Sequence, residues 1–285
     1  MTLAGLVDYA LNTLRDVRQI ASAPRADRKP LLITELRLRA RDARSRFTRP
    51  EPAAPPSMHT RMLGFDVAFH DYATLAYLFG EIFVHRIYAF ESENPQPVIV
   101  DAGSNMGMAV LFFKRLYPHA RVLAVEPEPT SFRLLEKNVI GNSLGDVRLV
   151  NAALGAADGE VSFFHQPGSL LASTRKERAV NDSVTVVRAA TLSSLLDEPV
   201  DFLKLDVEGA EHDVLADLEQ SGKLALIERM ACEYHHHLAG EDRLGEFLHV
   251  LERSGFGYLV RSKPRAPLDE GRTEDLLVWA YRKQD

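Results

Sequence analysis

The titratable side chains that could do chemistry gather where apolar runs of the sequence end. Asp206 and Glu208 follow the run FLKL, Glu211 comes shortly after them, and Glu233 and His235 end the next apolar run. Ligands of open α/β sheets bind outside the carboxyl ends of the strands, so we expect these side chains on one rim. A carboxylate or an imidazole there could remove a proton from a hydroxyl. We predict Asp206 as the general base, with His235, Glu233 and Glu208 as further catalytic candidates.

The same side chains allow other interpretations. A set of His and carboxylate groups can bind a divalent cation that lowers the pKa of a coordinated hydroxyl. No fixed ligand spacing supports such a site, so we assign no metal ligand and leave the need for a divalent metal open. Glu211 is also explained as a carboxylate in the first turn of a helix, favoured by the helix dipole. Lys204 lies between apolar residues, and we interpret it as an ion-pair partner.

A glycine loop follows the apolar run VIV. Glycine lets the backbone turn sharply and approach a ligand closely. The spacing Gly103-x-x-x-Gly107 lacks the second close-approach glycine of a dinucleotide fingerprint, which disfavours pyrophosphate binding. The loop is therefore predicted to bind another cofactor through Asp101, Gly103, Ser104, Asn105 and Gly107.

Further cofactor contacts are predicted after the next two apolar runs. Glu126 ends the run VLAV, about 20 residues beyond the loop, where a carboxylate can accept hydrogen bonds from both hydroxyls of a ribose. Asn151 and Ala152 follow the third run, where an adenine could meet a side-chain amide or a backbone N–H group. Tyr88 precedes the first strand and is predicted either to contact the cofactor or to be a core aromatic residue.

These motifs together carry a family resemblance. The stretches DAGSNMG, EPEP, NAALG and DFLKLDVEGAEHDVL resemble the FkbM family of S-adenosylmethionine-dependent methyltransferases, over about residues 80 to 235. The resemblance implies S-adenosyl-L-methionine as cofactor and methyl transfer, commonly to a hydroxyl of a natural product or sugar. One departure is Ser193, where the family often has Asp, and this departure concerns the hydrogen bonds of that turn.

The elements that must position these residues form an α/β pattern. From residue 98 onward, short apolar runs alternate with amphipathic helices, as expected for βαβ units around a parallel sheet. EVSFFH and SVTVVRA are predicted to pair antiparallel, and GYLVRS and LLVWAYRK to form a terminal pair. With the resemblance, this predicts a Rossmann-like class I methyltransferase fold with a seven-stranded, mostly parallel sheet and helices on both faces.

The N-terminal part differs in charge and pattern. Residues 1 to 50 hold 11 Lys and Arg against 5 Asp and Glu, a net of +6, so the rest of the chain carries −12 of the total of −6. We divide the chain into a helical extension with a Pro-rich linker at 1–60 and a methyltransferase domain at 61–285. The basic helix is interpreted as a solvated face, with a substrate lid, the arm of a homodimer or a site for an anionic partner as alternatives.

Composition and charge limit the class of protein, its partners and its location. Hydrophobic residues make up 46% and charged residues 26%, as in ordinary globular proteins. The acidic body argues against nucleic acid as partner. A single cysteine, Cys232, with no signal peptide or apolar span, suggests a cytoplasmic protein.

We expect an O-methyltransferase acting on a hydroxyl of a small-molecule natural product or glycosyl substrate. The alternatives are an NAD-dependent oxidoreductase, or a non-catalytic S-adenosylmethionine-binding protein.

Overall fold

The computed structural model describes residues 3–45, 57–165, 172–173, 183–236, 243–262 and 274–283. The chain forms two compact units, of which the first holds residues 1–89 and 140–143 and the second holds residues 90–139 and 144–285. The Pro-rich segment at 50–56 lies outside the described residues. The units divide at residue 89 and not at 60, the predicted domain boundary, because the segment after residue 60 packs with the N-terminal helices.

The first unit is built from two long helices, a hairpin and a shorter helix that ends in a π-helical turn. Asp71 caps the shorter helix, since its side chain accepts a hydrogen bond from the backbone N–H of Thr74 at 2.8 Å. That helix ends before Arg86, whose φ of 56° is left-handed. The elements are α1 (Leu3–Ser22), α2 (Arg25–Ser45), β1 (Met58–Met62), β2 (Phe65–Phe69), α3 (Tyr72–Phe79) and the π-helix Gly80–Val84.

A buried ion network joins three elements of this unit. Arg39 on α2 donates to Asp16 of α1 and to Glu35 of its own helix, both at 2.6 Å. Nε2 of His85 lies 2.7 Å from the other oxygen of Asp16. The buried face of α2 therefore includes charged residues, whereas the apolar Leu36 of the same helix is 48% exposed.

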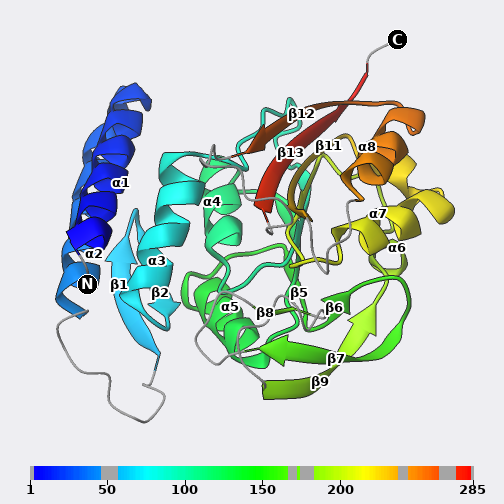
Figure 1. The fold of residues 1–285 in the computed structure, drawn as a ribbon, viewed down its shortest axis with the longest axis horizontal. Helices are drawn as coiled ribbons and strands as arrows, with labels where there is room; N and C mark the ends of the chain where they lie inside the picture. Colours follow the sequence, from blue (N-terminus) through cyan, green and yellow to red (C-terminus); the bar gives the residue numbers. More distant parts are fainter. Residues whose placement is uncertain are drawn as a thin grey trace. The chain divides into compact units, whose positions relative to one another are not determined.

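The second unit is organised around a seven-stranded sheet (Figure 1). All strands are parallel except β13, which pairs antiparallel with β11 on one side and β12 on the other. The strand order is β12-β13-β11-β10-β3-β4-β5. The bounds are β3 (Val98–Ala102), β4 (Arg121–Val125), β5 (Val147–Val150), β10 (Phe202–Leu205), β11 (Arg229–His236), β12 (Phe256–Ser262) and β13 (Glu274–Arg282).

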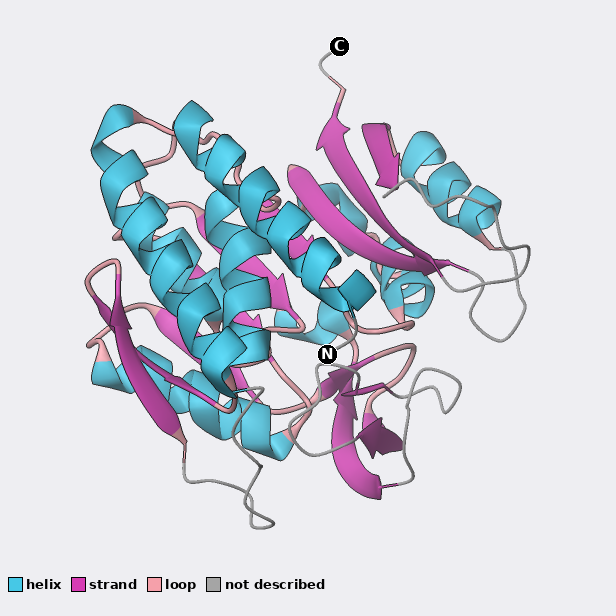
Figure 2. Cartoon of the chain, turned by 60° about the vertical axis from the view of Figure 1, so that its left-hand side comes forward, coloured by secondary structure: helices cyan, strands magenta, loops and turns pink. Residues whose placement is uncertain are grey.

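Helices cover both faces of this sheet, as Figure 2 shows from a second direction. α4 (Met108–Leu116) and α5 (Pro129–Gly141) lie on one face, and α6 (Leu192–Leu195), α7 (Glu211–Gln220) and α8 (Leu244–Arg253) on the other. The central strands are buried on both sides, so every residue of β10 is buried. This sheet order with one reversed strand confirms the predicted class I methyltransferase fold.

A smaller four-stranded sheet lies between β5 and β10 in the sequence. Its strands are β6 (Ala153–Leu154), β7 (Gly159–His165), β8 (Ala172–Ser173) and β9 (Ser183–Ala190), in the order β6-β9-β7-β8. β7 and β9 pair antiparallel, as predicted from their alternating sequences. Ala153, Phe163 and Val187 form its small apolar core. A 3₁₀ turn at Lys223–Leu226 leads into β11.

Among the helices that the structure describes, none combines the length and the apolar character that a bilayer span requires.

Candidate active site

The glycine loop brings the ends of β3 and β10 into close contact. Gly103 has a φ of +88°, and a Cβ atom on it would lie 1.7 Å from the carbonyl oxygen of Asp206. A Cβ on Gly107, with a φ of +85°, would lie 2.7 Å from Cδ1 of Leu135 on α5. Gly103 is therefore required by the backbone of Asp206, whereas its glycine was first explained by a ligand, and Gly107 is favoured by its positive φ.

A pocket opens at the carboxyl ends of β3, β4 and β10. Its position agrees with the general rule for ligands of open α/β sheets. The lining residues come from the glycine loop, the EPEP turn, the start of the insertion and the segment after β10. They are Gly103, Asn105, Val125, Glu126, Pro127, Glu128, Ser131, Ala152, Ala153, Leu154, Phe163, Asp206, Val207 and Glu208.

Glu126 is a buried carboxylate in this pocket. Its two oxygens accept hydrogen bonds from the backbone N–H of Asn105 at 2.7 Å and of Glu128 at 2.8 Å. Burial raises the pKa of Glu126 to about 8, although these hydrogen bonds act in the opposite direction. Each carboxylate oxygen still has a lone pair for a further donor, which suits the group to a ligand with two hydroxyls.

The other predicted cofactor contacts fall into two groups. Asn105, Gly103 and Ala152 line the pocket with Glu126. Asp101, Ser104, Gly107, Asn151 and Tyr88 are not among the lining residues.

Asn151 and Tyr88 each have a structural contact or position of their own. The side-chain amide of Asn151 donates to the carbonyl oxygens of Glu126 and Pro127, at 2.7 and 3.1 Å, and so stabilises the turn after β4. Tyr88 belongs to the first unit and is 2% exposed, in agreement with its alternative interpretation as a core aromatic.

Several lining residues were not predicted from the sequence. Glu128 and Ser131 belong to the EPEP turn and the start of α5, where Oε2 of Glu128 accepts from the backbone N–H of Ser131 at 2.5 Å. Proximity to Glu126 was the available signal for Glu128. Phe163 comes from β7 of the insertion, and no local pattern indicates which alternate face of such a strand meets a pocket.

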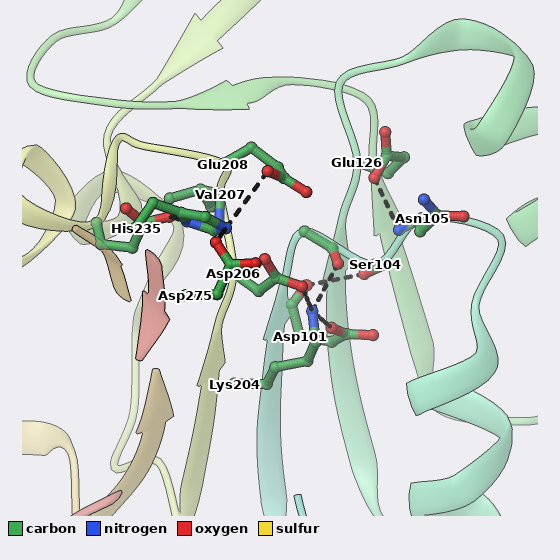
Figure 3. Close-up of polar contacts among 12 residues, drawn as sticks. Asp101, Ser104, Asn105, Glu126, Lys204, Asp206, Val207, Glu208, His235 and Asp275 are labelled. Carbon is green, nitrogen blue, oxygen red and sulfur yellow. Dashed lines mark hydrogen bonds and ion pairs between the residues drawn. The ribbon is translucent and has the colours of Figure 1, made fainter. Parts of the chain in front are cut away.

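The predicted catalytic side chains Asp206, Glu208 and His235 lie together on the opposite side of the pocket from Glu126 (Figure 3). His235 on β11 is 5% exposed, and its Nδ1 lies 2.8 Å from Oε1 of Glu211. Burial acts to raise the pKa of Glu211, but His235 and the backbone N–H of Gly209 outweigh it and lower the value. Nε2 of His235 lies 3.4 Å from Oε2 of Glu208. Glu211 is therefore a partner of His235 as well as a first-turn carboxylate.

Lys204 is the buried cation beneath this rim. Its Nζ donates to the carbonyl oxygen of Gly103 at 2.7 Å and lies 3.3 Å from both Asp101 and Asp206. Burial lowers the pKa of Lys204, but the carboxylates of Asp206, Asp101 and Glu233 outweigh burial and raise it. Lys204 is therefore an ion-pair partner, as predicted. Glu233, on the same face of β11 as His235, is not among the lining residues.

The match to known proteins decides the family. Residues 101–258, more than half of the chain, match the model of the methyltransferase FkbM domain. The chain belongs to the FkbM methyltransferase family. It is therefore a methyltransferase, as expected, and not the NAD-dependent oxidoreductase that was the alternative. The turn at Ser193 keeps its hydrogen bonds in this FkbM methyltransferase, since Ser193 donates to Asp217 through its hydroxyl at 2.6 Å and its N–H at 2.9 Å.

Characterised FkbM relatives resemble the chain over most of their length. Methyltransferase 1 of Beauveria bassiana is 31% identical over 68% of this chain and 85% of its own. The 31-O-demethyl-FK506 methyltransferase FkbM of Streptomyces tacrolimicus is 26% identical over 70% of this chain and 89% of its own. The 2-O-methyltransferase NoeI of Sinorhizobium fredii is 29% identical over 47% of this chain and 62% of its own.

Proposed function

We propose that this FkbM methyltransferase uses S-adenosylmethionine to methylate a hydroxyl group of a small-molecule natural product or of a glycosyl substrate. The observation that carries the proposal is a single pocket lined by Glu126 on one side and by Asp206 and Glu208 on the other (Figure 3). Glu126, a carboxylate suited to a ribose, thus shares one pocket with Asp206 and Glu208, which are suited to a hydroxyl acceptor.

The Glu126 side of the pocket fits the nucleoside part of the cofactor. Two ribose hydroxyls would donate to Glu126, and these donors stabilise the charged form of a carboxylate that burial disfavours. Ala152, Ala153 and Leu154 offer an apolar wall for an adenine. When bound, S-adenosylmethionine supplies an electrophilic methyl group on a sulfonium.

Asp206 is proposed to receive the proton of the acceptor hydroxyl. Methyl transfer forms the oxygen–carbon bond of the ether and breaks the carbon–sulfur bond, whose electron pair stays on sulfur. The hydroxyl proton passes to the carboxylate of Asp206, which lines the pocket and has a side chain 23% exposed. Glu208 and His235 contact each other beside it and orient the acceptor, and Glu233 acts on the same rim through its charge.

Transfer to oxygen is supported by the relatives. The names of FkbM and NoeI each specify methylation at an oxygen. The acceptor class is taken from the family resemblance. The pocket wall that includes Phe163 belongs to the insertion between β5 and β10, and the sequence of this insertion does not indicate a ligand.

The proposal is tested by ligand binding and then by turnover. S-adenosylhomocysteine should raise the melting temperature and NAD should not, because a ligand that binds the native state stabilises it. A panel of hydroxylated natural products and glycosides is then incubated with S-adenosylmethionine, and methyl ethers are detected by mass spectrometry. Failure to bind S-adenosylhomocysteine overturns the cofactor assignment. Binding without turnover of any acceptor favours the non-catalytic alternative.

A further inference from the structure

Three side chains on the rim converge on one point outside β10 and β11. An oxygen of Asp206, an oxygen of Glu208 and a ring nitrogen of His235 all lie within 4.8 Å of one another. Glu208 adopts a left-handed φ of 54°, which carries its carboxylate toward His235, as Figure 3 shows. The three atoms come from different residues of two neighbouring strand ends, so the spacing is a property of the fold and not of a linear motif.

The imidazole of His235 is held in one orientation. Oε1 of Glu211 accepts from the backbone N–H groups of Val207 at 3.2 Å and Gly209 at 2.9 Å and lies 2.8 Å from Nδ1 of His235. A carboxylate accepting this many hydrogen bonds is an acceptor toward the ring as well, so Nδ1 carries the proton. Nε2 then presents its lone pair toward Glu208 at 3.4 Å and Asp275 at 3.7 Å, and an oxygen of Asp206 lies within 4.8 Å of the pair formed by His235 and Glu208. Metal-bound histidines have this same arrangement, in which a buried carboxylate fixes the second ring nitrogen.

Charge makes a cation at this point favourable. Two carboxylates and a lone pair repel one another at these separations unless positive charge lies between them. The ammonium of Lys204 lies 3.3 Å from Asp206, but it also donates to Gly103 and lies 3.3 Å from Asp101. Its positive charge is therefore shared on the inner side of the rim, toward β3. The outer side, between Glu208 and Nε2 of His235, is the position at which a cation would offset the charge of the two carboxylates.

We propose that Asp206, Glu208 and His235 bind one divalent metal ion that coordinates the acceptor hydroxyl. Two carboxylates and one imidazole suit ions of hard to intermediate character, such as Mn²⁺. The ion would lower the pKa of the hydroxyl, whose proton would pass to solvent water at the open rim before the oxygen–carbon bond forms, and Asp206 would then act as a metal ligand in place of the base of the proposed function. This catalytic consequence rests on the proposed function, whereas metal binding itself does not. The alternative cation is a proton on Nε2, which would make His235 an imidazolium paired with Glu208.

The test measures metal binding without cofactor or acceptor. Chelator-treated, full-length protein is titrated with Mn²⁺, and free Mn²⁺ is followed by electron paramagnetic resonance. We expect one saturable site per chain, weakened about tenfold or more in Glu208→Gln and His235→Asn. The matched controls are His249→Asn and Glu252→Gln on α8, an exposed pair whose Nδ1 and Oε2 atoms lie 3.8 Å apart. These controls should bind Mn²⁺ as the parent does.

Glu211→Gln tests the orienting carboxylate. It keeps the side-chain shape and should weaken Mn²⁺ binding by about 10–100-fold, since partners of metal-bound histidines have effects of that size. Melting curves of every variant establish that it is folded. The proposal is overturned if the parent has no saturable Mn²⁺ site below about 1 mM, the weak limit of protein calcium sites, or if folded Glu208→Gln and His235→Asn bind as the parent does. Calorimetry with S-adenosylhomocysteine on the same metal-free samples separates this failure from failure of the proposed function.

Discussion

At the scale of single residues, Glu126 combines burial with a task that requires charge. In the free protein its pKa is raised to about 8, so it is mostly protonated at pH 7. Because the folded-state pKa lies above the unfolded one, the contribution of Glu126 to stability falls as pH rises from the unfolded value, about 4.3, toward 8. Donors from a ribose would reverse this effect by stabilising the carboxylate.

Binding of S-adenosylhomocysteine at pH 7 should therefore release a proton from Glu126. Calorimetry in two buffers of different ionisation enthalpy measures the release, which should disappear in Glu126→Gln. Glu126→Ala should weaken binding about tenfold or more, because charge-assisted hydrogen bonds are lost. The control is Glu160→Ala, an exposed carboxylate of β7 outside the pocket lining. Unchanged affinity in folded Glu126→Ala would remove Glu126 from the cofactor site.

Asp206→Asn should separate chemistry from cofactor binding. The substitution keeps the shape and removes the charge, so turnover of an identified acceptor should fall about 10²-fold or more, while cofactor affinity changes only a few fold. His235→Ala should act in the same direction, and the double variant should be less than additive, because one proton-removal step is lost only once. If turnover stops with a chelator and returns with Mn²⁺, Asp206 acts as a metal ligand and not as the base. Parent turnover in Asp206→Asn would shift the assignment to Glu208 or Glu233.

The residues that could be predicted share one property. Glu126, Asp206 and Glu208 follow buried strands directly, so the rule that ligands bind at strand ends was sufficient to locate them at the pocket. Asn151 also follows a strand, but the direction of its side chain depends on a turn that sequence does not specify. The orientation of His235 by Glu211 joins residues 24 apart and required the three-dimensional structure.

At the scale of elements, the loop after β3 depends on a backbone contact. The carbonyl oxygen of Asp206 occupies the position that a Cβ on residue 103 would take. The neighbour is backbone at the end of a central strand, so it cannot move aside as a flexible side chain would. The glycine loop and the catalytic segment are thus one structural unit, although about 100 residues separate them in the sequence.

Gly103→Ala should consequently reduce stability as well as cofactor binding. We expect a loss of about 2 kcal/mol or more in the free energy of unfolding, from the clash and from the positive φ of +88°. Gly141→Ala is the matched control, because this residue ends α5 and a Cβ there meets nothing within 4 Å. Urea unfolding measures both variants. Parent stability in Gly103→Ala would mean that the loop can move away from β10.

The strands were predicted well because burial on both faces leaves a short, continuous apolar run, as in β10. The helix faces were predicted less well. On α2, the buried face carries Glu35, which pairs with Arg39 of the same helix, and Arg39 in turn pairs with Asp16 of α1, so hydrophobic periodicity alone does not select this face. Polar burial of this kind depends on partners that lie elsewhere in the chain.

At the scale of the whole molecule, the residues that line the pocket all belong to the second unit. The first unit includes α1 and α2 together with α3, whose residues Leu75 and Phe79 are fully buried. The N-terminal helices therefore belong to the first folded unit, together with α3. They are not a separate extension that ends before residue 60. A cut at the Pro-rich segment would divide that unit.

Removal of residues 1–56 should therefore affect the two units differently. Cofactor affinity should stay within a few fold of the parent value, because the deletion removes no pocket residue. The remainder of the first unit should lose stability, since α3 loses its contact with α2. Apolar side chains that are buried in the full chain, such as Leu75 and Phe79, should then become exposed and lower the solubility. Calorimetry with S-adenosylhomocysteine measures the first effect, and limited proteolysis measures the second by the rate of cleavage between residues 57 and 89. A truncated protein that keeps a folded second unit but no longer binds S-adenosylhomocysteine would show that the first unit supplies part of the cofactor site, and Tyr88 would then return as a candidate contact.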